Sequence, residues 1–238
     1  MRKVAVLIPA HNEELLIGLT LESVSRQLPA EDIYVVDDGS LDKSGLVAKK
    51  FTKNVLNLFP KRGKATALNL AIDHFKLTKR YQYLMPLDAD TILAANFFDH
   101  NLSILEKDKR KKIACVVGKV VGKNLTWVTV YRAWEYEVAQ TIHKNAQSLI
   151  DAVIVCPGCS TVYRSEIFSK VSIPTGTITE DMDFTFLIHR RKLGRIVFTG
   201  KAVVITQDPN KMADFIGQID RWYTGFWQCV LKHNIPWQ

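Results

Sequence analysis

Short apolar runs alternate with segments of helical period along the first half of the chain. A short apolar run between polar turns is typical of a buried strand, whereas apolar positions at i, i+3, i+4 and i+7 are typical of a helix. The alternation predicts strands at residues 4–8, 33–36, 54–58 and 83–87, and helices at 13–27, 42–51, 64–75 and 96–105. Strict alternation indicates βαβ crossovers, a mostly parallel sheet flanked by helices, and ligand chemistry at the carboxyl ends of the strands.

The second half of the chain has a less regular pattern. It predicts strands at residues 113–121 and 161–163, a helix at 181–192, and a hairpin formed by 196–198 and 202–205. A long helix is predicted at 126–150, and we expect its aromatic stripe to pack into the core; the stripe consists of Trp127, Tyr131, Trp134, Val138 and Ile142. Residues 212–230 have the spacing of a strongly amphipathic helix rich in aromatic side chains.

Composition narrows the class of protein. A chain of 238 residues with 47% hydrophobic and 24% charged residues is long enough to build one globular core without disulfides. Its 32 lysines and arginines outnumber its 24 acidic residues, so the net charge of +8 favours an anionic partner: nucleic acid, an acidic membrane or a phosphorylated ligand. Four irregularly spaced cysteines fit a reducing compartment. Without a secretory signal or a long apolar run, we expect a soluble or membrane-surface protein.

Acidic residues follow two of the predicted strands. Asp37-Asp38-Gly39-Ser40 is able to hold a nucleotide base and ribose, although a surface turn explains the Asp-Gly pair equally well. Asp88-Ala89-Asp90 places two carboxylates one residue apart after a strand, where both can converge on a hard divalent cation that takes oxygen ligands. Such an ion would clamp a diphosphate. The alternative for Asp90 is a helix N-cap.

Three other motifs carry candidate chemistry. Lys61-Arg62-Gly63-Lys64 precedes a predicted helix and is either an anion site or a solvated basic turn, but its spacing is not that of a Walker P-loop. Thr179-Glu180-Asp181 opens another helix, and Asp181 is either a general base or part of an N-cap. Gln218, Arg221 and Trp222 share one helix edge, which suits a phosphate and a sugar face; an ordinary core helix with a salt-bridged arginine is the alternative.

Taken in order, these motifs closely resemble those of the family 2 glycosyltransferases of GT-A fold, from the first strand to about residue 227. Pro9-Ala10-His11-Asn12-Glu13 is similar to the first-strand nucleotide motif of that family. The Q-x-x-R-W pattern at 218–222 is similar to that of its processive branch, which includes poly-N-acetylglucosamine, hyaluronan, chitin and cellulose synthases. The resemblance implies a single GT-A catalytic domain over 1–238, with a nucleotide-binding half at 1–110, an acceptor-side half at 111–210 and an amphipathic interface helix at 211–238.

The resemblance also implies a role for each matching residue. Asp38 would contact uracil, Asp88 the ribose or diphosphate, Asp90 a Mn²⁺ or Mg²⁺ ion, and Asp181 would be the catalytic base of an inverting reaction. The other expected site residues are Pro9, Ala10, Asn12, Glu13 and Lys64 around the nucleotide, Gln218, Arg221 and Trp222 at the diphosphate and acceptor, and Glu180, Cys159 and Ser160 in the acceptor pocket.

The implied reaction transfers a sugar from a UDP-sugar, with UDP-N-acetylglucosamine as the expected donor, to a glycan acceptor in β-linkage. The alternatives are a polyprenyl-phosphate sugar transferase, a catalytically inactive scaffold of the same fold, and a basic nucleic-acid-binding module. We expect no nucleic-acid partner, because the basic residues are spread along the chain without a recognised motif. Relatives in the processive branch carry transmembrane helices. The aromatic helix at 212–230 and the basic net charge suit an anionic membrane interface, as the resemblance implies for that helix, so we expect this chain at the cytoplasmic, inner face of a membrane, on its surface or with a membrane-embedded partner.

Cys156-Pro157-Gly158-Cys159 fits the C-x-x-C pattern of redox proteins and zinc sites. It follows a long predicted helix rather than opening one after the first strand, which argues against a thioredoxin-like function. No second ligand pair accompanies it, because Cys115 and Cys229 stand alone in the sequence, which argues against zinc.

Overall fold

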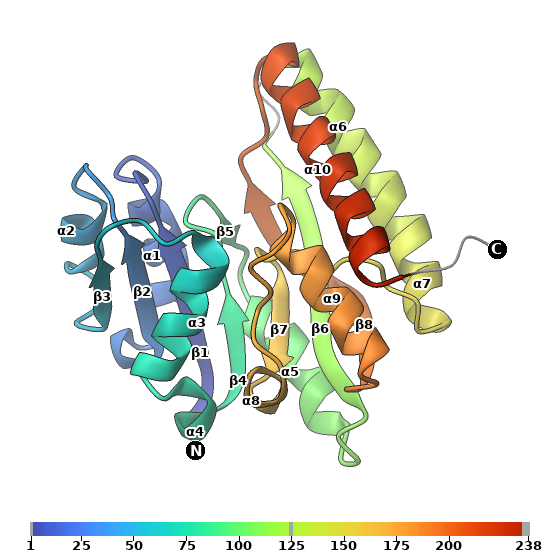
Figure 1. The fold of residues 1–238 in the computed structure, drawn as a ribbon, viewed down its shortest axis with the longest axis horizontal. Coiled ribbons are helices and arrows are strands. Elements are labelled where there is room, and N and C mark those ends of the chain that lie inside the picture. The colour runs from blue at the N-terminus through green and yellow to red at the C-terminus, as the bar shows by residue number, and fades with distance from the viewer. Residues whose placement is uncertain (1, 124–125, 235–238) are drawn as a thin grey trace.

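Within residues 2–123 and 126–234, which the computed structural model describes, eight strands form one sheet in the order β3-β2-β1-β4-β7-β6-β8-β5 (Figure 1). The strands are β1 Arg2–Ala10, β2 Ile33–Asp38, β3 Val55–Leu58, β4 Tyr81–Pro86, β5 Ile92–Leu93, β6 Ile113–Gly122, β7 Thr161–Arg164 and β8 Arg195–Thr206. The sequence analysis divides the chain into a nucleotide-binding half at 1–110, an acceptor-side half at 111–210 and an interface helix at 211–238. Position 1 of the first, positions 124–125 of the second and positions 235–238 of the third lie outside the described residues. The division of the chain into those segments stays a prediction.

The helices alternate with the strands in the first half, as the sequence predicts, and the longest helix is the last one in the described part of the chain. They are α1 Ile17–Ser25, α2 Ser44–Ala48, α3 Lys64–His74, α4 Leu77–Arg80, α5 Phe97–Lys107, α6 Trp127–Val138, α7 Asn145–Leu149, α8 Glu166–Lys170, α9 Glu180–Arg190 and α10 Met212–Lys232. A 3-10 turn covers Ala30–Asp32, and a π-helical turn at Ala139–Lys144 joins α6 to α7.

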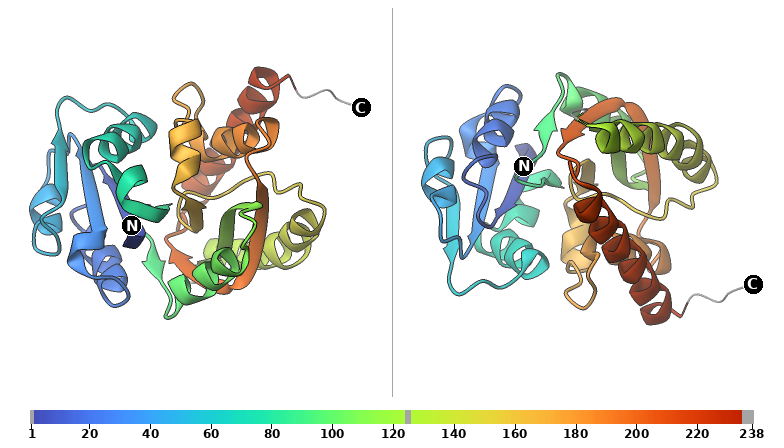
Figure 2. Two further views of the ribbon diagram at one scale, coloured as in Figure 1. Left: turned by 90° about the horizontal axis from the view of Figure 1, so that it is seen from below. Right: turned by 90° about the horizontal axis from the view of Figure 1, so that it is seen from above.

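Helices cover both faces of the sheet because successive strand residues point to opposite sides. On β1, Val6 and Ile8 pack on one face with Leu21 of α1 and other apolar residues of α2 and α5. Ala5 and Leu7 pack on the other face with apolar residues of α3, α4, α8 and α9. Figure 2 shows these layers from below and from above the view of Figure 1. The buried strands are near-continuous apolar runs because both faces are covered.

Strand direction places the carboxyl ends of the N-terminal strands at one edge. β1 runs parallel to β2 and β4, and β2 runs parallel to β3, so the mostly parallel sheet is confirmed. β7 runs antiparallel to β4 and β6, whereas β6 and β8 run parallel. The turns that follow β1, β2 and β4 carry the predicted nucleotide and metal motifs.

The hairpin predicted at 196–198 and 202–205 is wrong. Both segments belong to the single strand β8, which runs parallel to β6 along its whole length. The register shifts where Gly118 pairs with Thr199 and the next residue, Lys119, pairs with Val203. The residues around Gly200 therefore form a bulge that continues the strand, not a turn that reverses it.

The prediction that the aromatic stripe of residues 126–150 packs into the core is also wrong. Trp127, Tyr131, Trp134 and Ile142 are exposed. α6 instead buries Arg132, which hydrogen-bonds to Gln218 of α10 and packs on the rings of Phe215 and Trp222. α10 and α6 overlap in Figure 1, whereas Figure 2 shows that they run in different directions from this contact. The helical period is as predicted, but the polar face of the helix points inward.

Candidate active site

A cavity of about 560 Å³ collects most of the predicted site residues at the carboxyl edge of the sheet. The motif residues on its wall are Lys64, Asp88, Asp90, Cys159, Glu180, Asp181, Gln218, Arg221 and Trp222. They come from α3, the turn after β4, the loop before β7, α9 and α10, which are far apart in the sequence. Another cavity, of about 700 Å³, is lined by residues such as Gln82 and Arg164 and contains none of these motifs.

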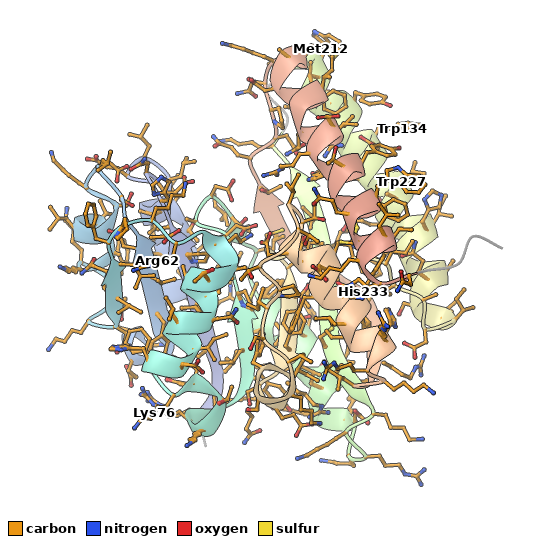
Figure 3. The ribbon with its side chains drawn as sticks, viewed as in Figure 1. Arg62, Lys76, Trp134, Met212, Trp227 and His233 are labelled. Carbon is orange, nitrogen blue, oxygen red and sulfur yellow. The ribbon has the colours of Figure 1, made fainter. Side chains whose placement is uncertain are left out.

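Lys64 joins two acidic motifs of the cavity. Its ammonium lies 2.6 Å from Oδ1 of Asp88 and 2.8 Å from Oε1 of Glu180. Burial alone would lower the pKa of Lys64, but the charges of Asp88 and Glu180 raise it well above its usual value. The interpretation of a solvated basic turn is therefore wrong for Lys64, although it fits the exposed Lys61 and Arg62. Arg62 is labelled in Figure 3.

Asp38 holds the basic turn in place. Its two carboxylate oxygens accept hydrogen bonds from the backbone N–H groups of Arg62 at 2.6 Å and Gly63 at 2.8 Å. Gly63 has a φ of 88°, a backbone conformation that favours glycine. These bonds fix the start of α3, and Lys64 with it. The predicted contact between Asp38 and a base stays a prediction.

The first-strand motif interlocks with the turn after β2. Asn12 has a φ of 59°, and its Oδ1 accepts a hydrogen bond from the backbone of Leu41 at 2.8 Å. The N–H of Glu13 donates to the Ser44 hydroxyl at 2.7 Å. Pro9 and Ala10 end β1 beside β2. Pro9, Ala10, Asn12, Glu13 and Asp38 are not among the residues that line the 560 Å³ cavity.

Glu13 nevertheless lies within electrostatic reach of the aspartates after β4. Burial raises the pKa of Glu13, and the nearby charges of Asp90, Asp42 and Asp88 raise it further. Burial likewise raises the pKa of Asp90, and so does the charge of Asp88. This concentration of carboxylates at one edge favours binding of a cation. No helix begins at Asp90, because the two-residue strand β5 follows, so the N-cap alternative is wrong.

The donor set suits a divalent ion that is shared with a diphosphate. Among the described residues, no group of three His, Cys, Asp or Glu side chains is close enough to hold a metal alone. Mg²⁺ in nucleotide sites commonly takes one or two carboxylates and completes its shell with phosphate oxygens and water. Asp88 and Asp90 supply carboxylates of that kind, so the residues present fit such an ion.

Asp181 stands in the wall of the cavity at the start of α9. Burial raises its pKa, and the charge of the adjacent Glu180 raises it further, whereas Lys64 lowers it. Oδ1 accepts a hydrogen bond from the N–H of Met182 at 2.8 Å. Thr179 occupies the N-cap position, but its side chain makes no capping hydrogen bond. A cavity-facing carboxylate with a raised pKa has the properties of a general base.

Gln218, Arg221 and Trp222 lie together on the cavity wall, as their helical spacing predicts. Arg132 of α6 supports two of them: its Nη2 donates to Oε1 of Gln218 at 3.2 Å, and its guanidinium carbon lies 4.7 Å from the ring centre of Trp222. Arg221 is exposed and leaves its guanidinium open to the cavity.

The loop before β7 brings the C-x-x-C segment to the cavity. Pro157, Gly158 and Cys159 line the wall, and a side chain at Gly158 would lie 3.2 Å from the Lys64 ammonium. Cys156 does not pair with Cys159; its sulfur lies 3.7 Å from that of Cys115, and all of these thiols are free and buried. Ser160 is fully buried and is not among the cavity-lining residues.

A row of four polar residues at or behind the wall was missed by the sequence analysis. Arg132, Tyr136, Gln140 and Lys144 lie at spacings of four along α6 and the π-helical turn. Arg132 supports the wall from behind, and the other three line it. The missed signal was this polar row, which runs along the helix opposite the aromatic stripe.

Comparison with known proteins decides the family. A sequence model described as "Glycosyl transferase family 2" matches residues 5–172, which is most of the chain. The chain belongs to this family. It is a glycosyltransferase of GT-A fold, as the resemblance predicted.

Curated relatives match almost the whole chain. A poly-β-1,6-N-acetyl-D-glucosamine synthase of Staphylococcus epidermidis is 28% identical, and the match covers 98% of this chain and 57% of that protein. The synthase of the same name from Staphylococcus aureus strain COL is 27% identical, with 96% of this chain and 56% of the relative covered. The chain thus spans less than two thirds of the length of these relatives.

Solved structures share the fold at lower identity. A mannosyltransferase from Pyrobaculum calidifontis with GDP-mannose and Mn²⁺ is 17% identical with a TM-score of 0.70, covering 97% of this chain and 65% of that one. TarS residues 1–349 from S. aureus with UDP-N-acetylglucosamine has a TM-score of 0.64 at 18% identity, covering 88% and 59%. Glucosyl-3-phosphoglycerate synthase from Mycobacterium tuberculosis with Mn²⁺ and UDP has a TM-score of 0.66 at 18% identity, covering 100% and 82%.

Proposed function

We propose that this glycosyltransferase moves N-acetylglucosamine from UDP-N-acetylglucosamine to a glycan hydroxyl, with inversion to a β-linkage. The observation that carries the proposal is one cavity wall on which Asp88, Asp90, Asp181 and the Q-x-x-R-W residues meet. The choice of donor is supported by the poly-β-1,6-N-acetyl-D-glucosamine synthases that match nearly the whole chain, and by the UDP-N-acetylglucosamine bound to TarS.

The nucleotide end is assigned to the strand-end motifs. Asp38 contacts the uracil, with Pro9, Ala10, Asn12, Glu13 and Lys64 around the nucleotide. Asp88 faces the ribose or diphosphate, and Asp90 holds Mn²⁺ or Mg²⁺. When bound, that cation stabilises negative charge on the leaving diphosphate. The ion pairs of Lys64 with Asp88 and Glu180 fix this end of the cavity relative to α9.

Asp181 is the proposed general base. Its carboxylate takes the proton of the acceptor hydroxyl while the hydroxyl oxygen forms a bond to the anomeric carbon. The bond from that carbon to the diphosphate oxygen breaks on the opposite side, which inverts an α-linked donor to a β-linked product. Arg221 and Gln218 bind the diphosphate, and its leaving charge is stabilised by the guanidinium of Arg221. Trp222 stacks on the acceptor sugar, and Glu180, Cys159 and Ser160 shape the acceptor pocket.

The direct test is a transfer assay with a matched binding control. Wild type with UDP-N-acetylglucosamine, Mn²⁺ and an N-acetylglucosamine oligomer should extend the oligomer by a β-linked sugar, as NMR of the product will show. Asp181→Asn should lose about 10²- to 10⁴-fold in rate while UDP still raises its Tm. Full activity in Asp181→Asn would overturn the assignment. Transfer to polyprenyl phosphate instead of the oligomer would replace the glycan acceptor with a lipid.

The outer face of α6 and α10 supports a second part of the proposal, that the domain lies on an anionic membrane surface at the cytoplasmic side. Trp134 and Trp227 lie on the outer side of the helix pair, and Met212 lies at its end (Figure 3). Trp134 is 62% exposed and Tyr223 is 66% exposed. Exposed aromatic residues on amphipathic helices are typical of interfacial binding, and the net charge of +8 favours acidic lipid. Among the described helices, none is long and apolar enough to cross a bilayer.

Vesicle sedimentation tests the membrane contact. The protein should sediment with phosphatidylglycerol vesicles more strongly than with phosphatidylcholine vesicles. Trp134→Ser combined with Tyr223→Ser should reduce that binding at least tenfold. Leu41→Ser is the control, because Leu41 is even more exposed, at 87%, but lies in a loop after β2. Equal binding of both variants would contradict the assignment of this face.

A further inference from the structure

The cavity wall formed by the π-helical turn carries an ammonium group that has no bonded partner among the described residues. Lys144 lines the cavity, yet its side chain forms no ion pair or hydrogen bond with any residue in the described part of the chain. The residue is only 8% exposed. Lys64, the other lysine of this cavity wall, is held by two carboxylates.

The π-helical turn is what brings Lys144 to the cavity. Bonds of the i→i+5 type widen a turn, so residues four apart stay on one face for longer than in a regular α-helix. Tyr136, Gln140 and Lys144 follow this spacing and all line the cavity. A regular helix would rotate Lys144 progressively out of that row. Single π-turns of this kind occur frequently at functional sites.

Neighbouring polar groups are engaged elsewhere. The Gln140 side chain accepts from the N–H of Val120 at 2.7 Å and donates to its carbonyl at 2.6 Å. Gln147 accepts from the N–H of Ile154 at 3.4 Å. Burial lowers the pKa of Lys144, against the opposing charges of Cys156, Cys159 and Asp181. A largely buried cation on a cavity wall without a bonded partner favours binding of an anion that enters the cavity.

We propose that Lys144 binds an anionic oxygen group of the acceptor, a carboxylate or a phosphate ester, and so makes the enzyme select negatively charged acceptors. The inference rests on the proposed function, because Asp181 marks where the acceptor hydroxyl reacts. All four residues line the same cavity, but Lys144 lies within electrostatic reach of Asp181 and not of the donor-side Asp88 and Asp90. The Lys144 charge offsets the repulsion that Asp181 would exert on an anionic acceptor.

A structural alternative uses the same lysine internally. Burial alone would raise the pKa of the Cys156 thiol, but hydrogen bonding to Cys115 and Thr185 and the charge of nearby Lys144 lower it. If the only function of Lys144 were to stabilise a Cys156 thiolate, Cys156→Ala would change acceptor binding as much as Lys144→Met does. The proposal predicts that Cys156→Ala keeps the preference for charged acceptors.

Equilibrium binding tests the proposal independently of turnover. The probes are a neutral N-acetylglucosamine trimer, the same trimer ending in a uronic acid, and the same trimer carrying a phosphate monoester, each titrated by calorimetry with UDP and Mn²⁺ present. Wild type should bind one or both charged probes about 10- to 100-fold more tightly than the neutral one, the strength expected for a hydrogen bond to a charged group. The stronger of the two identifies the anionic group.

Lys144→Met should abolish that preference, and Lys144→Arg should keep most of it. Lys49→Met, at an exposed lysine after α2, is the matched control and should keep all of it. A wild type without preference, or a Lys144→Met variant that keeps it, would overturn the proposal. Failure of the proposed function has a separate signature, because wild type would then show no Tm response to UDP and Mn²⁺.

Discussion

Arg132 of α6 and Gln218 of α10 meet between the two helices, where Nη2 of Arg132 donates a hydrogen bond to Oε1 of Gln218 at 3.2 Å. The Arg132 side chain is almost completely buried among the rings of Tyr136, Phe215 and Trp222, with its guanidinium carbon 4.5 to 5.2 Å from their centres. α6 therefore positions the Q-x-x-R-W motif through one guanidinium.

Replacing Arg132 should loosen that motif. Arg132→Met keeps most of the apolar volume but removes the hydrogen bonds to Gln218 and Tyr136 and the ion pair with Glu135, which should cost about 1.5–3 kcal/mol in free energy of unfolding. Arg132→Lys should recover little, because an ammonium lacks the planar fork. Urea unfolding measures the effect, with Arg110→Met at an exposed position as control. Equal stability of the Arg132 and Arg110 variants would refute this role.

Two glycines of α10 should respond in opposite ways to alanine. A Cβ at Gly225 would lie 2.3 Å from Oγ1 of Thr179, the residue just before Glu180, whereas a Cβ at Gly217 would meet nothing within 4 Å. Gly225→Ala should destabilise the fold by about 1–3 kcal/mol through overpacking and displace the start of α9. Gly217→Ala should stabilise it by up to about 1 kcal/mol through helix propensity. Thermal unfolding should show a lower Tm for Gly225→Ala and a higher Tm for Gly217→Ala. Equal changes in the Tm of both variants would contradict the close packing of α9 and α10.

Asp183 ties α9 to the end of α10. Its carboxylate accepts hydrogen bonds from Lys232 at 2.7 Å, His233 at 2.7 Å and Thr177 at 2.8 Å. Burial alone would raise the pKa of Asp183, but these bonds lower it below its usual value. Its contribution to stability is therefore present above the pKa of an unfolded aspartate and is lost as pH falls through the lower folded value.

Asp183→Asn should accordingly lower the free energy of unfolding by about 2–3 kcal/mol near neutral pH, and by progressively less in acid. Free energies of unfolding measured from pH 2 to pH 7 give the profile. Asp73→Asn, at an exposed position of α3, should leave it unchanged. A constant difference between wild type and Asp183→Asn across this range would show that the carboxylate charge is not responsible.

Glu180 should raise the pH at which the acid limb of the pH–rate profile falls. Burial and the charge of Glu180 raise the pKa of Asp181, and a general base works only when deprotonated, so the rate should fall at a higher pH than an exposed aspartate would give. Glu180→Gln removes the negative charge, lowers the pKa of Asp181 and should move the limb to lower pH. Profiles of kcat/KM measure the shift, with Glu166→Gln on α8 as control. Movement to higher pH would exclude Asp181 as the base.

The parallel half of the fold was predictable because its strands are buried on both faces. The runs that form β1, β2 and β4 are short and continuously apolar, and they lack the spacing of apolar residues that is typical of a helix. β8 was divided in error because Gly200 in an apolar run is typical of a turn, and only the partner strand β6 shows that it marks a bulge. The helix at 126–150 had the right period, but a period does not say which face is buried.

The site was predictable where its residues follow strand ends or share a helix edge. Asp88, Asp90 and Asp181 belong to motifs with recognisable spacing, and the cavity brings them together. Arg132 and Lys144 were not predictable in this way, because a buried arginine or lysine opposite an aromatic stripe contradicts the usual orientation of an amphipathic helix. Contacts with α10 and a π-helical turn place them, and both depend on tertiary packing.

The most direct test of the central claim, a metal-dependent UDP site at the carboxyl edge of the sheet, is the Tm of wild type and Asp90→Asn with UDP or GDP, in Mn²⁺ or chelator. UDP at 100 times its Kd should stabilise wild type by about 2.7 kcal/mol, a Tm rise of roughly 5–10 °C for a chain of this size. The rise should vanish with chelator and in Asp90→Asn, but persist in Asp99→Asn on α5. No rise with UDP, or an equal rise in Asp90→Asn, would contradict the account.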